Sequence, residues 1–260
     1  SSTSPNFQNI PIRTETGREV RKAFVPQNSD WVILSADYSQ VELRIMAHYS
    51  QEPELIKAFE ENSDIHNRTA ALVNGIAEAE VTPDQRRSAK VVNFGIMYGA
   101  GPYRMSQELG ISMADAKTLI DTYFKTYPGI KRYMNETIES ARKKGYVETL
   151  YHRRRSTNSL NASNRNMVHA EERAAINMPI QGTAADIIKI AMINIHKRME
   201  IEKYQSKMIL QIHDELMFEC PQSEVDTIAK IVVEEMEGAV QLAVPLKVDW
   251  KYGKSWFEAH

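Results

Sequence analysis

The hydrophobic pattern begins with a short apolar run that is typical of a buried strand. Trp31–Leu34 contains no polar residue, so a strand is predicted there, with Asp37 at its carboxyl end. Ser39 and Glu42 have the spacing of a capping box, in which a hydroxyl and a carboxylate satisfy the first amides of a helix. A helix is therefore predicted to begin at about Gln40.

The middle of the chain has the apolar spacing of helices. Thr82 and Gln85 form a second capping box, with Pro83 at the first helical position, which predicts a helix to about Tyr98. The further segments are a helix from Ser112 that ends before Pro128, a helix over 130–144 stopped by Gly145, an extended segment over 146–151 and a helical pattern over 166–203. Pro179 predicts a kink or a break in the last of these, because proline lacks an amide hydrogen.

Strand-like segments return near the end of the chain. Residues 209–212 and 216–219 are predicted strands of a hairpin with acidic residues at its tip, and 246–250 is a predicted final strand. Ser223 is the predicted cap of a helix that runs to about Leu242. Since the strands lie at both ends, the predicted class is α+β, an antiparallel sheet interrupted by a mostly helical insertion of roughly 120 residues.

Composition narrows the class of protein. The chain has 260 residues, of which 42% are hydrophobic and 25% charged, as in globular domains and unlike disordered or collagen-like chains. Lys and Arg number 32 and Asp and Glu 34, so the net charge is 32 − 34 = −2, and any site for a polyanion must be local. No apolar run approaches the roughly 20 residues of a membrane span. Cys220 is the only cysteine, which favours a reducing intracellular compartment.

The candidate catalytic residues are carboxylates. Asp37 follows a predicted strand, and Asp214 and Glu215 lie at the hairpin tip, so strands of one sheet can bring these acids together. Paired carboxylates bind divalent cations, and two such cations can support phosphoryl transfer. Spacing alone favours a simpler interpretation, in which Asp37 and Asp214 are turn residues that bond to their own backbone.

The helix opened by Thr82 carries a second candidate group. Arg86, Lys90, Phe94 and Tyr98 follow one another at steps of four and therefore share one slowly drifting face. Two cations followed by two rings match the phosphates and base of a nucleoside triphosphate. An amphipathic helix with a solvated basic end explains the pattern equally well. Gly95 favours the first interpretation, since an interior glycine usually has a packing or close-approach reason.

Several segments resemble sequence motifs of family A DNA polymerases, the bacterial DNA polymerase I type. Asp37–Arg44, Arg86–Gly99 and His213–Glu215 resemble motifs A, B and C of that family. Further similar segments are Pro5–Pro11, Asp64–His66, Gln181–Asp186 and Trp256–His260. The resemblance runs nearly end to end, in the order and approximate spacing of the family.

This resemblance implies a two-metal site. Asp37 and Asp214 are expected to hold two Mg²⁺ ions, with help from the backbone carbonyl of Tyr38. Glu215 is expected to be an accessory catalytic carboxylate, and Lys90 the proton donor to the leaving pyrophosphate. The nucleotide-binding residues implied in this way are Gln40, Glu42, His66, Arg86, Lys90, Phe94 and Tyr98. Glu42 is read both as the acid of a capping box and as a gate against a ribose 2′-hydroxyl.

The resemblance also implies a set of DNA-binding residues. These are Asn6, Gln8, Asn9, Arg153, Arg154, Arg155, Arg173, Asn177, Gln181 and His213. For an isolated Asn or Gln, a loop or cap hydrogen bond is the simpler interpretation, and a run of arginines is usually a solvated cluster. Contacts with the minor groove and with template phosphates are the alternatives that the resemblance favours.

The implied domains are a palm over 1–48 and 176–260 and a fingers domain over 49–175. Thumb and exonuclease domains of the family are not present in the sequence, which starts without Met and is expected to be a piece of a longer chain. Weak, distributive or absent activity is expected of the 260 residues alone.

The implied function is template-directed DNA synthesis from primer–template DNA and deoxynucleoside triphosphates. A monomer without membrane contact is expected, in the bacterial cytoplasm at the nucleoid, with an organelle or phage origin left open. A catalytically inactive nucleic-acid-binding relative is the alternative, although a binder has no need of paired acids that repel each other. A single-subunit RNA polymerase is disfavoured by Glu42 and by His213–Glu215.

Overall fold

The computed structural model describes residue 10 and residues 15–260, and the chain divides into two compact units. Unit 1 comprises Ser1–Val41, Ala185–Gln241 and Leu246–His260, and unit 2 comprises Glu42–Ala184 and Leu242–Pro245. The described part of unit 1 contains an antiparallel sheet, whereas unit 2 is mostly helical. The predicted α+β class with a helical insertion is therefore confirmed.

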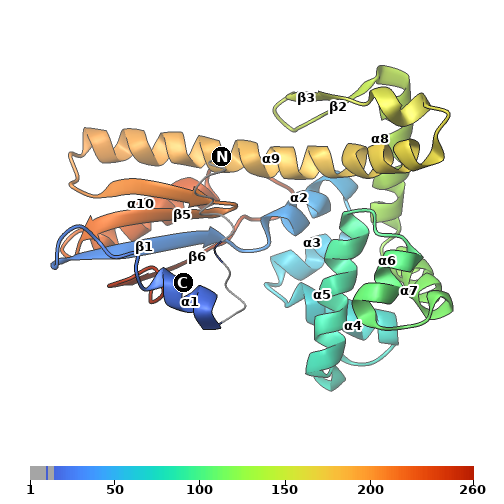
Figure 1. Ribbon diagram of the computed structural model, residues 1–260, viewed down its shortest axis with the longest axis horizontal. Helices are drawn as coiled ribbons and strands as arrows, with labels where there is room; N and C mark the ends of the chain where they lie inside the picture. The colour runs from blue at the N-terminus through green and yellow to red at the C-terminus, as the bar shows by residue number, and fades with distance from the viewer. Residues whose placement is uncertain (1–9, 11–14) are drawn as a thin grey trace. The chain divides into compact units, whose positions relative to one another are not determined.

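The sheet of unit 1 contains strands from both ends of the chain (Figure 1). Its order is β4–β5–β1–β6, and all neighbours are antiparallel. The strands are β1 (Trp31–Tyr38), β4 (Lys207–Ile212), β5 (Glu215–Pro221) and β6 (Val248–Gly253). The predicted hairpin is confirmed as β4–β5, while β6 begins two residues later than predicted and continues to Gly253.

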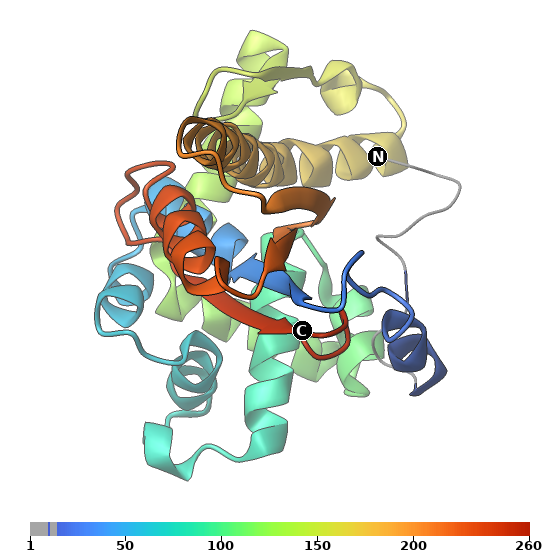
Figure 2. The ribbon, with the colours of Figure 1, turned by 90° about the vertical axis from the view of Figure 1, so that its left-hand side faces the viewer.

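Both faces of β1 are covered, which explains its continuous apolar run. Helix α10 (Val225–Glu237) packs on β1 and β6 (Figures 1 and 2), and the Tyr38 hydroxyl donates to the carbonyl of Met236 at 2.6 Å. On the other face, Ile33 packs in a buried cluster with Met217 and Trp256. Helix α1 (Glu15–Arg21) adds Arg21, whose guanidinium lies 4.0 Å from the centre of the Trp256 ring.

Two helix starts differ from the predictions. Helix α10 has Glu224 rather than Ser223 at its N-cap, and it ends at Glu237, five residues before the predicted end. The Glu224 carboxylate accepts from the Ser206 amide and hydroxyl at 3.0 and 2.7 Å, so a tertiary contact determines this start. Helix α2 (Val41–Ser50) begins one residue later than predicted, because Gln40 has φ +56° and is not helical.

Unit 2 is built from helices that the sequence predicts in part. Thr82 caps α5 as predicted: the Gln85 amide donates to its hydroxyl at 3.2 Å, and the Thr82 amide donates to the Gln85 side chain at 2.8 Å. Ser112 caps α7, and Gly145, with φ +78°, ends α8. Besides α2, the elements are α3 (Pro53–Glu60), α4 (Ile65–Asn74), η2 (Glu78–Glu80), α5 (Pro83–Met97), α6 (Pro102–Leu109), α7 (Met113–Thr126), α8 (Pro128–Lys144), η3 (Asn158–Asn161) and the first part of α9 (Arg165–Ile201).

Of the kink or break predicted at Pro179, the break does not occur, because α9 continues through this residue. A proline in a helix costs about 3 kcal/mol, and burial of an isoleucine side chain returns about 1.5–3 kcal/mol. Ile176 and Ile180 are both buried beside Pro179. Their burial offsets the hydrogen bond that the proline removes.

The arginine-rich segment of unit 2 lies on a small hairpin that the sequence did not predict. Strand β2 (Tyr146–Glu148) covers only half of the predicted extended segment and pairs with β3 (Arg154–Ser156). The amide of Thr149 donates to the carbonyl of Arg153 at 2.9 Å and closes the turn. A Cβ on Gly182 of α9 would lie 2.6 Å from the Thr149 methyl carbon, so glycine permits this close approach.

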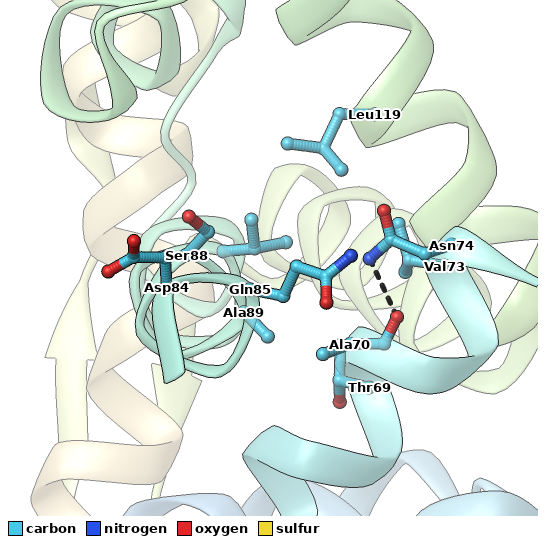
Figure 3. Close-up of a pocket in the computed structure, with 10 residues that line it drawn as sticks. Thr69, Ala70, Val73, Asn74, Asp84, Gln85, Ser88, Ala89 and Leu119 are labelled. Atoms are coloured by element: carbon cyan, nitrogen blue, oxygen red, sulfur yellow. Dashed lines mark hydrogen bonds between the residues drawn. The ribbon is translucent and has the colours of Figure 1, made fainter. Parts of the chain in front are cut away.

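Unit 2 also contains a cavity of about 250 Å³ between α4, α5 and α7 (Figure 3). The side chains of Asn74 and Gln85 point toward one another across it, and Leu119 lies above them. The Asn74 amide nitrogen donates to the carbonyl of Ala70 at 2.7 Å. The cavity therefore has an apolar wall and an amide-lined edge.

Candidate active site

Four acids of unit 1 meet at one end of the sheet. Asp37 on β1 is directly opposite Glu215 on β5 and Asp249 on β6. Asp214 lies in the two-residue turn before β5, and its carbonyl accepts from the Tyr38 amide at 3.3 Å. His213, the other turn residue, has φ +55°. The tertiary fold therefore brings Asp37 and Asp214 together although 214 − 37 = 177 positions of the 260-residue chain separate them.

The charge state of Asp37 reflects this crowding. Burial and then the charges of Asp214 and Glu215 raise its pKa to about 7, because each of these opposes a further negative charge. The Oδ1 atom of Asp37 is buried and has no hydrogen-bond partner among the residues that the structure describes. Burial also raises the pKa of Asp214. A cation would relieve the repulsion and supply the missing partner.

Glu215 is in the opposite situation. It is 4% exposed, yet one carboxylate oxygen accepts from Ser35 Oγ at 2.6 Å and from Trp256 Nε1 at 3.3 Å. The other oxygen lies 3.7 Å from His260 Nδ1. Burial by itself would raise the pKa of Glu215, but the bonds from His260 and Ser35 outweigh it and the pKa is lowered. Glu215 is thus a fixed, fully partnered carboxylate.

The carboxylate oxygens of this site fit a metal ion whose remaining ligands are water and substrate. No group of three or more His, Cys, Asp or Glu side chains among residue 10 and residues 15–260 is placed to hold a metal ion. Asp37 and Asp214 offer two carboxylates, one of them with an orphaned oxygen. Mg²⁺ in phosphoryl-transfer sites is often bound by one or two carboxylates, with water and substrate phosphates completing the shell. The acids fit that mode of binding.

The second candidate group lies on α4 and α5 of unit 2. Arg86 Nε donates to Asp64 Oδ2 at 2.6 Å, whereas Lys90 is exposed and has no ion pair with the described residues. The ring of Phe94 lies 5.8 Å from the ring of His66 and 6.3 Å from that of Tyr98. The rings of Phe94 and Tyr98 are therefore neighbours at one end of α5, and Arg86 and Lys90 lie nearer to its other end.

His66 is a buried, neutral imidazole. Burial lowers its pKa to about 4; Asp64 opposes this shift, and the positive charges of Lys90 and Arg86 add to it. Its backbone amide donates to Asp64 Oδ1 at 3.0 Å, in the first turn of α4. The side chain is therefore a hydrogen-bonding group without charge at neutral pH.

The C-terminal end of α5 is joined to α2 and α9 within unit 2. The hydroxyl of Tyr98 donates to the carboxylate of Glu42, and the Asn177 amide lies 3.5 Å from the Tyr98 carbonyl. Gly99 has φ +72°, and a Cβ there would lie 2.8 Å from Arg173 Cγ. Gln181 lies one turn beyond Asn177 and is exposed.

The sequence model of DNA polymerase family A matches residues 1–258. This chain belongs to DNA polymerase family A. The resemblance seen in its motifs is thereby confirmed.

The relatives of this family A chain include bacterial enzymes named DNA polymerase I. It is 51% identical to that of Bacillus caldotenax over 259 residues and 54% identical to that of Streptococcus pneumoniae over 260 residues. Each alignment covers 100% of this chain and 30% of the relative. The chain thus spans less than a third of the length of these relatives.

A solved structure is similar over the whole family A chain. It is described as the POL domain of Pol1 from M. smegmatis in complex with DNA primer-template and dNTP. The TM-score is 0.96 at 45% sequence identity, and the match covers 100% of this chain and 46% of the other. The fold of this chain is therefore that of a polymerase domain.

The arginines expected to meet DNA in this family A chain have protein partners. Arg154 Nε lies 3.3 Å from Glu148 and its guanidinium 4.3 Å from the centre of the Tyr146 ring. Arg155 pairs with Glu171 at 2.6 Å. Asn6, Gln8 and Asn9 lie outside the described residues. Over the described part of the chain, no helix combines the length and apolarity that a membrane span requires.

Ser35, Trp256 and His260 are partners of Glu215 and were missed as site residues, while Asp249 is a neighbour of Asp37 that the sequence did not indicate. Asp249 is exposed and comes close to Asp37 only because β6 pairs with β1. The partners of Glu215 come from β1 and from the segment after β6. Only the family-like segment Trp256–His260 carried a signal in the sequence.

Proposed function

We propose that this chain is the palm and fingers of a DNA-directed DNA polymerase. The palm is assigned to 1–48 and 176–260 and the fingers to 49–175. The observation that carries the proposal is the pair Asp37 and Asp214, crowded at one end of a family A sheet, where a buried Asp37 oxygen has no partner from residue 10 or residues 15–260. The complex of a similar polymerase domain with DNA primer-template and dNTP supports the same substrates here.

Asp37, Asp214 and the backbone carbonyl of Tyr38 would hold two Mg²⁺ ions. When bound, such ions lower the pKa of the primer 3′-hydroxyl and neutralise the charge of the leaving pyrophosphate. Asp37 must be ionised to act as a ligand, so its raised pKa makes this role sensitive to pH near neutrality. Glu215 contributes a fixed negative charge, because its partners hold both of its oxygens.

The cations of α5 would act on the triphosphate. In the reaction, the primer 3′-oxygen gives its proton to solvent water and bonds to the α-phosphorus, and the bond from that phosphorus to the bridging oxygen of the pyrophosphate breaks. Lys90, which is exposed and unpaired with the described acids, would give a proton to that leaving oxygen. Arg86 is oriented by Asp64 at 2.6 Å, and His66 would donate a neutral hydrogen bond.

The rings and the acid of unit 2 would select the nucleoside. Phe94 would stack near the incoming base and sugar, and Tyr98 would hold the template-side stacking position. Glu42, which accepts from the Tyr98 hydroxyl, would crowd a ribose 2′-hydroxyl. Gln40 completes the proposed nucleotide-binding set. A monomer working on primer–template DNA, without membrane contact, is part of the proposal.

The proposed DNA contacts are of two kinds. Arg173, Asn177 and Gln181, at steps of four on α9, would approach the minor groove together with Asn6, Gln8 and Asn9. Arg153, Arg154 and Arg155 on the β2–β3 hairpin would meet template phosphates, which makes affinity fall with salt. His213 at the hairpin turn is the remaining proposed contact.

Single-turnover primer extension tests the proposal, with the chain in excess over primer–template so that processive movement is not needed. Asp37→Asn and Asp214→Asn should each slow extension by about 100-fold or more, since positioning of the metal ions is lost, while duplex affinity is kept. Asp249→Asn, an exposed acid on the neighbouring strand, is the matched control and should keep its activity. Equal extension by all three variants would overturn the assignment. Duplex binding without extension would favour the inactive relative if it persists in the chain restored to a family A thumb.

A further inference from the structure

A series of four buried side chains in unit 2 ends at the imidazole of His66. Tyr127 and Thr69 are 0% exposed, Asn93 is 1% exposed and His66 is 3% exposed. The Tyr127 hydroxyl lies 2.9 Å from Thr69 Oγ1, which in turn lies 3.2 Å from Asn93 Oδ1. The Asn93 amide nitrogen lies 3.0 Å from His66 Nδ1. Segments from α4, α5 and the start of α8 thus meet in one hydrogen-bonded row.

Tyr127 determines the direction of these hydrogen bonds. Burial raises its pKa to about 12, so its hydroxyl keeps its proton at neutral pH, and Thr69 is its hydrogen-bond partner among the described residues. A buried hydroxyl that fails to donate is strongly disfavoured, so Tyr127 donates to Thr69. Thr69 must then donate to an acceptor, which is the carbonyl oxygen of Asn93 rather than its amide nitrogen.

The Asn93 amide nitrogen therefore faces His66, and it can only donate. Because a neutral imidazole has one N–H and one acceptor nitrogen, Nδ1 is the acceptor and the proton lies on Nε2. We propose that Asn93 is a positioning residue that holds His66 in this Nε2–H tautomer, so that the ring presents a donor to a phosphate oxygen. The assignment of a triphosphate as recipient rests on the proposed function.

Nε2 is available for such a ligand. It has no hydrogen bond to the described residues. It is also not fully buried, because the fully buried polar atoms without a partner do not include it. The opposite tautomer would turn a lone pair toward the phosphate oxygen, which also carries lone pairs and negative charge. The charged groups that face His66 are Asp64, Lys90 and Arg86. They bear on its protonation but do not select between its two nitrogens.

Nitrogen-15 NMR of the histidine side chains tests the tautomer without any activity measurement. At about pH 7.5, Nε2 of His66 should carry the proton and Nδ1 should have the shift of an unprotonated nitrogen. In Asn93→Asp, a carboxylate of the same shape accepts from Nδ1, so the proton should move to Nδ1 and the His66 pKa should rise. Protonation of Nδ1 in the unaltered chain, or no change in Asn93→Asp, would overturn the inference.

Binding of dATP to this chain, measured by calorimetry, tests the consequence. In Asn93→Asp, affinity should be about tenfold weaker at about pH 8.5 than at about pH 6.5, because protonation restores the Nε2 donor and with it a hydrogen bond to a charged group. The unaltered chain should show a much smaller difference. If the tautomer is as proposed but dATP affinity does not depend on it, the triphosphate role of His66 is wrong, whereas the tautomer assignment stands.

A second variant guards against a failure of Asn93→Asp to fold. Thr69→Val removes the donor to Asn93 Oδ1 while keeping the shape of the side chain, so Asn93 can turn over and His66 should populate both tautomers. The matched control is Thr157→Val, another buried threonine, whose hydroxyl donates to the Ala141 carbonyl at 3.3 Å. The control should lose stability without a change of tautomer. A single Nε2–H tautomer in Thr69→Val would show that the row does not set it.

Discussion

Asp37 and Glu215 are direct cross-strand partners, yet the fold shifts their pKa values in opposite directions. Burial and neighbouring acids raise the pKa of Asp37 to about 7, whereas donors from Ser35, Trp256 and His260 lower that of Glu215 despite its burial. The difference lies in hydrogen-bond partners, because the Asp37 Oδ1 atom has none in the described part of the chain. Glu215 is stabilised by its protein partners, whereas ionised Asp37 would need a bound ligand to stabilise it.

This relationship predicts how stability depends on pH without divalent ions. The folded chain holds the Asp37 proton more tightly than the unfolded chain, with a pKa of about 7 against 3.8. The contribution of Asp37 to stability therefore falls as pH rises between these two values. Asp37→Asn should be more stable than the unaltered chain at about pH 8, by about 1–2 kcal/mol once solvent screening is allowed for, and nearly equal at about pH 4.

Urea unfolding in the presence of a chelator measures this difference. Asp249→Asn is the control, because Asp249 is exposed and contributes least to the shift of the Asp37 pKa among its charged neighbours. It should change stability by less than about 0.5 kcal/mol. A loss of stability in Asp37→Asn at about pH 8 would contradict the expectation that ionised Asp37 lowers the free energy of unfolding.

Divalent cations should offset the destabilisation that ionised Asp37 causes. Mg²⁺ that binds the folded chain alone raises its melting temperature by mass action, by an amount that grows with concentration. The rise should be present in the unaltered chain and in Asp249→Asn, and absent or small in Asp37→Asn and Asp214→Asn. Thermal unfolding with and without MgCl₂, at matched ionic strength, gives the comparison. Equal stabilisation of all four chains would show that the ions act elsewhere.

The junction after α5 should tolerate no side chain at Gly99. Gly99→Ala combines a left-handed backbone, φ +72°, with a Cβ only 2.8 Å from Arg173 Cγ, and should destabilise by about 2–3 kcal/mol. Gly75→Ala is the matched control, since Gly75 has φ +66° but nothing within 4 Å of its Cβ position. It should cost about 1 kcal/mol from the backbone alone. Denaturant midpoints that rank the two variants in the opposite order would contradict the close contact.

The cavity between α4, α5 and α7 should accept added carbon atoms. Ala89 lines this space of about 250 Å³, so Ala89→Leu should leave stability unchanged or raise it by up to about 1 kcal/mol. Ala116 on α7 is fully buried and does not line the cavity, so Ala116→Leu should cost about 1–3 kcal/mol through overpacking. Melting temperatures of both variants decide the matter. A loss in Ala89→Leu as large as in Ala116→Leu would show that the space is not accessible.

Local chemistry made several elements predictable. Trp31–Leu34 reads as a strand buried on both faces, and Thr82 with Gln85 caps α5 through contacts three residues apart. Predictions failed where a distant residue intervened. Glu224 starts α10 because Ser206 binds it, and the β2–β3 hairpin closes around Thr149, which packs on Gly182. Gly95 also packs closely, since a Cβ there would lie 2.8 Å from Met105 Cε, but that atom is the end of a flexible side chain that can shift.

The sequence by itself determined the family, the α+β class and the strand and hairpin that carry Asp37 and Asp214, because motifs, capping and apolar runs act between near neighbours. Only the tertiary structure decided that Asp249 lies beside Asp37, that Glu215 is fully partnered while an Asp37 oxygen is not, and that His66 is joined through Asn93 and Thr69 to Tyr127. These features depend on which groups share a buried space and on which donors reach them there. Burial and pairing between distant residues are set by packing, and no local pattern records them.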